Sequence, residues 1–295
     1  MSSHKNVNAL TAGGLLVTLG IVFGDIGTSP LYTLKAIFKI ALGEHKGSTP
    51  QTIDEALVLG ALSCIIWTLT LQTTVKYVIV TLRADNKGEG GIFSLYSLVR
   101  KKAKWLVIPA IIGGAALLAD GMITPSITVT SAIEGLQLKF PSLEVFPIVL
   151  TIIAILFIIQ QFGTNLVGKL FGPIMLLWFV VLGAMGFMHV IHSPFILKAL
   201  NPYYAVNLLT TNSEAFLILG GVFLCTTGAE ALYSDLGHCG KKNIRVSWIF
   251  VKSMLILNYL GQGAWILTHV DQDLKAINPF FELVPSSMVL YLVGL

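Results

Sequence analysis

Three acidic side chains lie inside long apolar segments of this 295-residue chain: Asp25, Asp120 and Glu230. An unpaired charge at the centre of a bilayer costs at least about 2.5 kcal/mol, so such an acid marks a functional site by default. An acid without a basic partner in a low dielectric either takes up a proton or holds a cation. Because these segments contain no evident buried base, the residues predict cation chemistry.

Hydroxyl groups near these acids could act as cation ligands. Asp120, Thr124 and Thr128 are spaced by four residues, so they share one helical face, which we expect to point into the protein rather than at lipid. An alkali cation needs several oxygen ligands, and we expect them from Tyr32, Thr124 and Thr227 together with free carbonyls at helix breaks. The alternative role of each acid is a structural hydrogen bond inside the bundle.

Two stretches carry both an acid and helix-breaking residues. GIVFGDIGTSPLY at 20–32 contains Asp25, and GVFLCTTGAEALY at 221–233 matches it at an offset of 201 residues and contains Glu230. Broken helices at membrane depth are tolerated only where the backbone lines a cavity or is satisfied by neighbours. The stretches fall in the first and sixth apolar segments, so the second five-span repeat would be inverted. Such repeats are typical of secondary transporters whose site lies between the two breaks.

The composition predicts an all-α integral membrane protein, since 55% of the residues are hydrophobic and only 12% are charged. Soluble domains carry roughly 25% charged residues. The predicted spans are 9–42 (broken at 24–30), 56–82, 105–133, 145–162, 166–191, 215–235 and 246–268, with an eighth that begins near residue 280 and is cut off. We therefore expect residues 1–295 to be the N-terminal part of a longer transmembrane domain.

Loop charge predicts the orientation. Basic residues gather in the loops after the even-numbered segments, which places the N-terminus in the cytoplasm. The loop 82–104 contains NKGEGG but lacks the pattern of a phosphate-binding loop, so we expect a flexible connector with a short amphipathic helix. Glu134 is expected to be solvated or to cap a helix. Four lysines inside or near the spans are expected to extend to the lipid headgroups: Lys35, Lys39, Lys76 and Lys252.

Several motifs together closely resemble the KUP/HAK/KT family of potassium uptake transporters. These are GDIGTSPLYTLKAIF at 24–38, RADNKGEGGIFSLYSL at 83–98, ADGMITPSI at 119–127, SAIEGL at 131–136 and GAEALYSDLGH at 228–238. The resemblance implies proton-coupled potassium import on the amino acid–polyamine–cation transporter architecture, with further spans, a cytoplasmic C-terminal domain and a homodimer formed through those later parts. It implies potassium binding by Asp25, Tyr32, Thr124, Thr227 and Glu230, and proton coupling by Asp120 and Glu230.

The expected function is therefore K+/H+ symport across the inner or plasma membrane, with potassium and protons as transported ions and no cofactor. The expected surroundings are the lipid bilayer, and the net charge of +4 gives no reason to expect nucleic acid, because most basic residues lie in loops. One alternative is a transporter of the same architecture for an organic solute, although Asp25 at the break disfavours a carboxylate substrate. Another is a potassium uniporter or channel, but a TVGYG-type filter is missing. No nucleophile–base or metal constellation suggests an enzyme.

Overall fold

The computed structural model describes residues 9–42, 53–160, 164–269 and 277–295. In these ranges the secondary structure is helical, joined by turns and one isolated β-bridge. Within the described residues, five helical segments are long and apolar enough to cross a membrane, and a bent pair at the start makes a sixth. The five are Glu55–Arg83, Lys104–Gln137, Phe171–His192, Ala215–Ser234 and Lys241–Thr268.

The first apolar segment is bent, as its glycines and proline predict. α1 (Ala12–Val22) meets the stretch Gly24–Leu31 at an angle of 69°. This stretch consists of the short helix α2 (Gly24–Thr28) and a 3₁₀ turn that contains Pro30, which lacks the N–H that a continuing helix needs. The α-helix α3 (Thr33–Ala41) then continues the first segment after the turn.

The second apolar segment changes from an α-helix to a π-helix near its middle. Asp54 caps α4 (Glu55–Thr68) by accepting a hydrogen bond from the N–H of Leu57 at 2.8 Å. From Leu69 to Val80 the chain is a π-helix, followed by one 3₁₀ turn to Arg83. The wider π turns are often found at functional sites, and this one carries the side chain of Lys76 towards the site described below.

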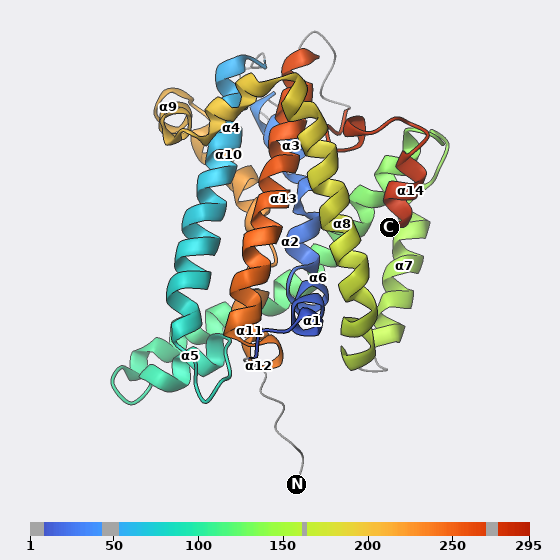
Figure 1. The fold of residues 1–295 in the computed structure, drawn as a ribbon. Coiled ribbons are helices and arrows are strands. Elements are labelled where there is room, and N and C mark those ends of the chain that lie inside the picture. Colours follow the sequence, from blue (N-terminus) through green and yellow to red (C-terminus); the bar gives the residue numbers. More distant parts are fainter. Residues whose placement is uncertain (1–8, 43–52, 161–163, 270–276) are drawn as a thin grey trace.

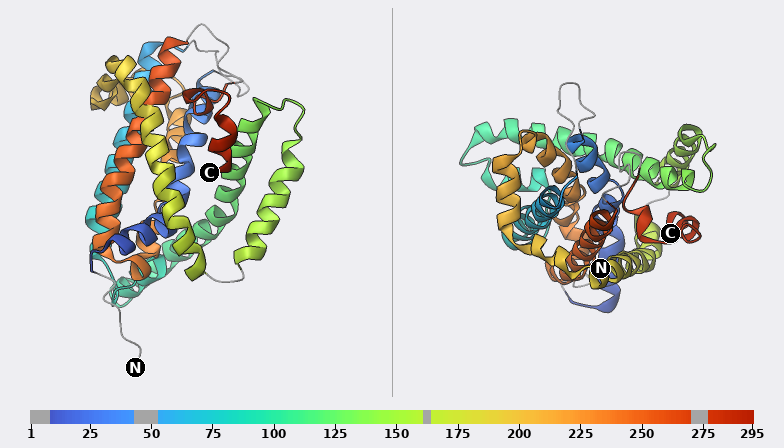
Figure 2. Two further views of the ribbon diagram at one scale, coloured as in Figure 1. Left: turned by 45° about the vertical axis from the view of Figure 1, so that its right-hand side comes forward. Right: turned by 90° about the horizontal axis from the view of Figure 1, so that it is seen from above.

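α6 and α7 form a pair of helices along one side of the bundle (Figure 2). α6 (Val107–Gln137) spans the predicted third segment. α7 (Val145–Gln160) has 16 residues. At ~1.5 Å per residue it is about 24 Å long, shorter than a ~30 Å hydrocarbon core, so the predicted fourth span is an apolar helix below spanning length. α5 (Ile92–Val99) precedes α6.

The remaining helices complete the bundle around the bent first segment (Figure 1). They are α8 (Thr164–His192), α9 (Pro202–Thr211), α10 (Ala215–Phe223), α11 (Ala231–Ser234), α12 (Leu236–Cys239), α13 (Lys241–Thr268) and α14 (Val289–Gly294). α13 packs extensively against α8 and α1, and the core includes Phe23 stacked on Trp248 with ring centroids 6.1 Å apart.

The last apolar stretch differs from its prediction. A helix expected from residue 280 begins only at Val289. Phe280 and Phe281 are buried, and they belong to a turn that packs into the bundle. Their hydrophobicity therefore serves packing against α8 and α13 rather than the start of a span.

α5, α11 and α12 lie at one end of the bundle and α9 lies at the other (Figure 1). We call the first of these the α5 end. The basic loop residues at Arg83 and Lys241 border α5 and α12, so they share this end, as their charge predicts for loops on one side of a membrane.

Candidate functional site

The two predicted helix breaks touch one another. Thr227 leaves the helix after α10 with an extended backbone (ψ 131°), and Gly228 has φ +84°. A Cβ placed on Gly228 would lie 2.5 Å from the Cβ of Asp25 and 2.8 Å from the backbone N of Ile26. Glycine is therefore required here both by its backbone conformation and by the approach of α2. The packing brings Asp25 and Glu230 to a common region.

The polar face of α6 turns towards these breaks, as the spacing predicts. The hydroxyl of Thr124 donates to Oδ1 of Asp120 at 2.9 Å, and Thr124 is 2% exposed. One turn further on, the hydroxyls of Thr128 and Thr28 are 3.2 Å apart, which ties α6 to α2. The prediction that this face points into the protein is confirmed.

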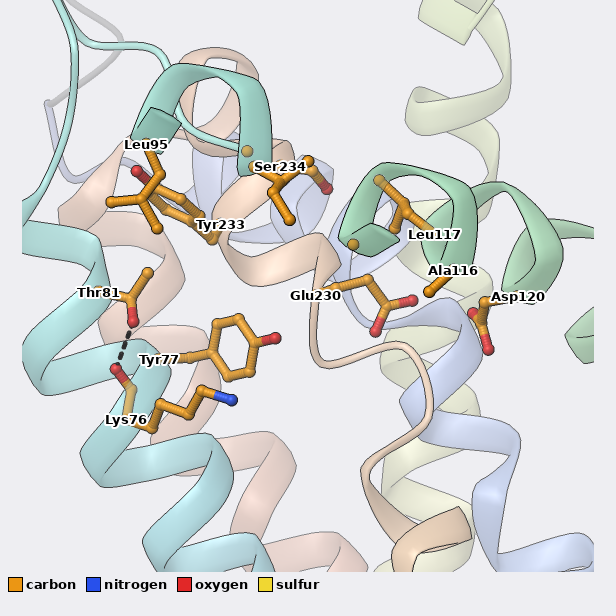
Figure 3. Close-up of a pocket in the computed structure, with 13 residues that line it drawn as sticks. Lys76, Tyr77, Thr81, Leu95, Ala116, Leu117, Asp120, Glu230, Tyr233 and Ser234 are labelled. Carbon is orange, nitrogen blue, oxygen red and sulfur yellow. Dashed lines mark hydrogen bonds between the residues drawn. The ribbon is translucent and has the colours of Figure 1, made fainter. Parts of the chain in front are cut away.

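Asp120 and Glu230 line one cavity of about 510 Å³ (Figure 3). Asp120 comes from α6, and Glu230 comes from the turn that precedes α11. The two carboxyl groups are close enough to influence each other electrostatically. Lys76 also lines this cavity, with its Nζ 5.2 Å from the centroid of the Tyr77 ring. The site therefore combines two carboxyl groups with one ammonium group.

Asp25 lines a second cavity of about 550 Å³, which has a largely apolar wall. α6 borders both cavities, with Asp120 on the first and Gly121 on the second. Asp25 is within electrostatic range of both other acids. Within the described ranges, however, no three side chains of His, Cys, Asp or Glu come close enough to hold one metal ion together. The three acids are thus a chain of interacting groups rather than a single chelate.

Tyr32 lies between the two helix breaks. It is buried directly after the 3₁₀ turn of the first segment, and its hydroxyl lies 3.4 Å from that of Ser29. Thr227, in the second break, lies near enough to the Tyr32 hydroxyl to influence it electrostatically. The structure thus brings Tyr32 and Thr227 together, and it places Thr124 on the neighbouring face of α6.

Three carbonyls of the first break accept hydrogen bonds from side chains elsewhere in the fold. Trp178 Nε1 donates to Gly27 O at 2.9 Å, Gln262 Nε2 to Pro30 O at 3.1 Å, and Asn278 Nδ2 to Leu31 O at 2.8 Å. The expectation of free carbonyls at this break is therefore wrong for these residues. The bonds instead satisfy a backbone that could not be left bare in a membrane.

The lysines of the spans also differ from expectation. Lys35 forms an ion pair with Glu134 at 2.7 Å, so neither is a purely solvated group. Lys252 donates to the hydroxyls of Thr70 at 3.0 Å and Thr74 at 3.2 Å, which fastens α13 to the π-helix. Lys76 lines the cavity of the acids but is itself exposed, so it does not contradict the expectation that the spans supply no buried base to the acids.

The fold and the site define a multi-pass helical membrane protein with an acidic site between two interrupted helices. A family model described as "K+ potassium transporter integral membrane domain" matches residues 12–295, and the chain belongs to this family. The resemblance found in the motifs is thereby confirmed.

Curated relatives agree with this assignment. The chain is 58% identical over 295 residues to a protein of Cytophaga hutchinsonii and 57% identical over 294 residues to one of Flavobacterium johnsoniae. It is 54% identical over 296 residues to one of Lactococcus lactis subsp. lactis. The first two are named "Probable potassium transport system protein Kup" and the third carries the same name with the number 2; these are names of transport proteins, not of enzymes. The alignments cover 96–98% of this chain but 43% of each relative. No solved structure matched the sequence.

The sequence indicated the acids and hydroxyls but missed two parts of the site. The donors to the first break, Trp178, Gln262 and Asn278, looked like ordinary residues of later segments. A signal for one of them was present, because Asn258 and Gln262 are four residues apart inside an apolar helix and bond to each other at 2.8 Å. The sequence around Lys76 carries no signal that this residue lines the same cavity as Asp120 and Glu230.

Proposed function

We propose that the protein imports potassium into the cell, and that the full-length natural protein acts as a K+/H+ symporter. The names of the relatives support potassium as the transported ion. The observation that carries the proposal is the contact between the two helix breaks, with Asp25 at one and Glu230 at the other. Secondary transporters bind ions and substrates at such interruptions.

We propose that potassium binds beside Tyr32, Thr124 and Thr227, with Asp25 supplying negative charge. The proximity of Thr227 to the Tyr32 hydroxyl and the burial of Thr124 support this position. Hydroxyl, carbonyl and carboxylate oxygens together replace the hydration shell of the ion. Since three carbonyls of the first break are occupied by donors, the second break and the hydroxyls would supply most of the neutral ligands. Glu230, beside the second break, would complete the ligand set.

Proton coupling is assigned to Asp120 and Glu230. Their carboxyl groups interact in one cavity, where the pair can hold a proton or respond to a cation. A potential of 100 mV, negative inside, adds about 2.3 kcal/mol to the import of each positive charge. Transport by alternating access would then move one helix group against the other around the breaks.

The remaining features of the family complete the proposal. The two broken segments would belong to inverted five-span repeats, and further spans and a cytoplasmic C-terminal domain would follow in the longer protein. The N-terminus and the α5 end would face the cytoplasm, and the longer protein would form a homodimer. An epitope accessibility assay on both sides of the membrane tests the orientation directly.

Rubidium uptake tests the function. The full-length natural protein is expressed in cells that lack their own potassium uptake, and uptake is followed with and without an inward proton gradient. We expect saturable uptake that rises with the gradient and loses this response in Asp120→Asn or Glu230→Gln. Uptake that ignores the gradient in every variant would indicate a uniporter or channel, and competition by an amino acid but not by potassium would indicate an organic substrate.

The binding site is tested in the same assay. Tyr32→Phe and Thr227→Val remove hydroxyl ligands and should raise the rubidium concentration for half-maximal uptake about tenfold. Tyr291→Phe is the matched control, because Tyr291 is 78% exposed on α14 and lies outside the site. Equal affinities in all variants would place the cation elsewhere.

A further inference from the structure

The glycine-rich loop at residues 84–91 has no part in the proposed ion site, yet it is ordered by its own hydrogen bonds. Asn86 and Glu89 exchange backbone hydrogen bonds of 2.9 and 3.0 Å, and Oδ2 of Asp85 accepts a hydrogen bond from Gly88 N at 3.0 Å inside the turn. The side chain of Asn86 donates to Ser97 in α5 at 2.7 Å. The loop and α5 thus form one unit, rather than the flexible connector that the sequence suggests.

This unit docks on the segment that follows the second helix break. The hydroxyl of Tyr233 donates to Ala84 O at 2.5 Å, and Lys241 forms an ion pair with Asp85. Gly90 lies so close to Tyr233 that a Cβ there would fall 1.8 Å from the Tyr233 carbonyl oxygen. The approach of the two backbones therefore requires glycine, as a tight docking surface would.

The docked unit also closes part of the cavity that holds the acid pair. Gly91, Ile92 and Leu95 from the loop and α5 line this cavity, and so do Tyr233 and Ser234 from the docking surface (Figure 3). All of these residues belong to elements at the α5 end of the bundle (Figure 1). The unit therefore stands between the acid pair, Asp120 and Glu230, and the solvent at that end.

We propose that residues 84–91 and the start of α5 form a lid over the Asp120–Glu230 cavity. The Asp85–Lys241 ion pair and the Tyr233–Ala84 hydrogen bond are its latches, and the lid must lift for a cation to pass between the cavity and the α5 end. That the lid controls the passage of a cation rests on the proposed function, whereas the docking contacts of the lid do not depend on that function.

Thiol labelling tests whether the latches keep the cavity closed. Ser234→Cys is introduced into the full-length protein with Cys64, Cys225 and Cys239 replaced by alanine, and an impermeant maleimide is applied from the α5 side. We expect Asp85→Asn or Lys241→Gln to raise the labelling rate about two- to fivefold, the range for one partly exposed ion pair. Glu134→Gln, which breaks the distant Lys35–Glu134 pair, is the control and should leave the rate unchanged.

A charge exchange separates the latch from a general loss of folding. Asp85→Lys and Lys241→Asp should each raise the labelling rate, whereas the double exchange restores the opposite charges and should return it towards that of the parent. If the rate stays at the parent value in every latch variant, the lid does not control access and the inference is wrong.

Reversible cross-linking tests whether the lid moves during transport. Asp85→Cys and Lys241→Cys are joined by a bifunctional methanethiosulfonate, and rubidium uptake is measured before bridging, after bridging and after reduction. Uptake should be lost on bridging and recovered on reduction, and full uptake by the bridged protein would overturn the lid. A parent protein that takes up no rubidium at all would instead refute the proposed function, while the labelling results would still decide the lid.

Discussion

Gly228 lies directly against Asp25, so close that a Cβ on Gly228 would be 2.5 Å from the Cβ of Asp25. The two residues are far apart in sequence, and each lies at a helix interruption. Their contact couples the conformations of the two breaks, because a displacement of one backbone must displace the other. A transporter that alternates between two states at these breaks would use such a contact to move both together.

Gly228→Ala should therefore damage both stability and transport. Alanine at φ +84° costs about 1–3 kcal/mol of strain, and its methyl group would push α2 away. We expect a lower thermal unfolding temperature of the purified full-length protein and a large loss of rubidium uptake. Gly220→Ala is the control, because Gly220 lies inside α10 with nothing within 4 Å of its Cβ position. There alanine should be neutral or stabilising, and equal losses in the two variants would argue against the contact.

The donor on Trp178 should stabilise the first break. Trp178→Phe keeps an aromatic ring but removes the N–H that Gly27 O accepts, and an unsatisfied buried carbonyl costs about 1–3 kcal/mol. Trp67→Phe removes a similar bond of 3.1 Å to Leu200 O at an exposed position, so we expect a loss below about 1 kcal/mol. Chemical unfolding of both variants measures the difference, and a larger loss in the Trp67 variant would contradict this account.

Lys76 should weaken cation binding at the acid pair. Its ammonium group lines the same cavity as Asp120 and Glu230, so Lys76→Gln removes a competing positive charge. We expect the rubidium concentration for half-maximal uptake to fall about three- to tenfold, the scale of one charge acting across a partly hydrated cavity. Lys76→Arg keeps the charge and should stay near the parent value. An unchanged affinity in the glutamine variant would show that the ammonium group does not reach the acids.

The contribution of the Asp85–Lys241 ion pair to stability should not change with pH across the physiological range. The hydrogen bond from Lys241 is the main cause that lowers the pKa of Asp85 from its ordinary value of 3.8. A carboxyl with a lowered pKa contributes its full stability above the ordinary value and loses it as the pH falls through the lower folded value.

Thermal unfolding of the parent and of Asp85→Asn at several pH values checks this. The difference in unfolding temperature should be constant from about pH 8 to about pH 5 and should vanish only in stronger acid. Comparison with Asp85→Asn removes the contributions of the other titratable groups near the lid, among them Glu89, Tyr233, Asp235 and His238. A difference that disappears near neutral pH would mean that another group controls the latch.

Much of the architecture could be predicted from local sequence. The apolar runs gave the long helices because insertion depends on the hydropathy of each segment, and the spacing of Asp120, Thr124 and Thr128 gave the inward face of α6. In two of the apolar runs the described helix is shorter than the predicted span: α7 is Val145–Gln160, and α14 begins only at Val289. The first is short for a span, and the second packs its phenylalanines into the bundle.

Residue types and their spacing predict which side chains can carry cation chemistry and where the helices break, because charge, proline and glycine act locally on the membrane-inserted backbone. What those residues face depends on how the helices pack. This packing places Gly228 against Asp25, lets Trp178, Gln262 and Asn278 donate to carbonyls of the first break, and puts Lys76 on the wall of the cavity that holds the acid pair. These contacts join segments distant in sequence, so they depend on the packing of whole helices rather than on any local pattern.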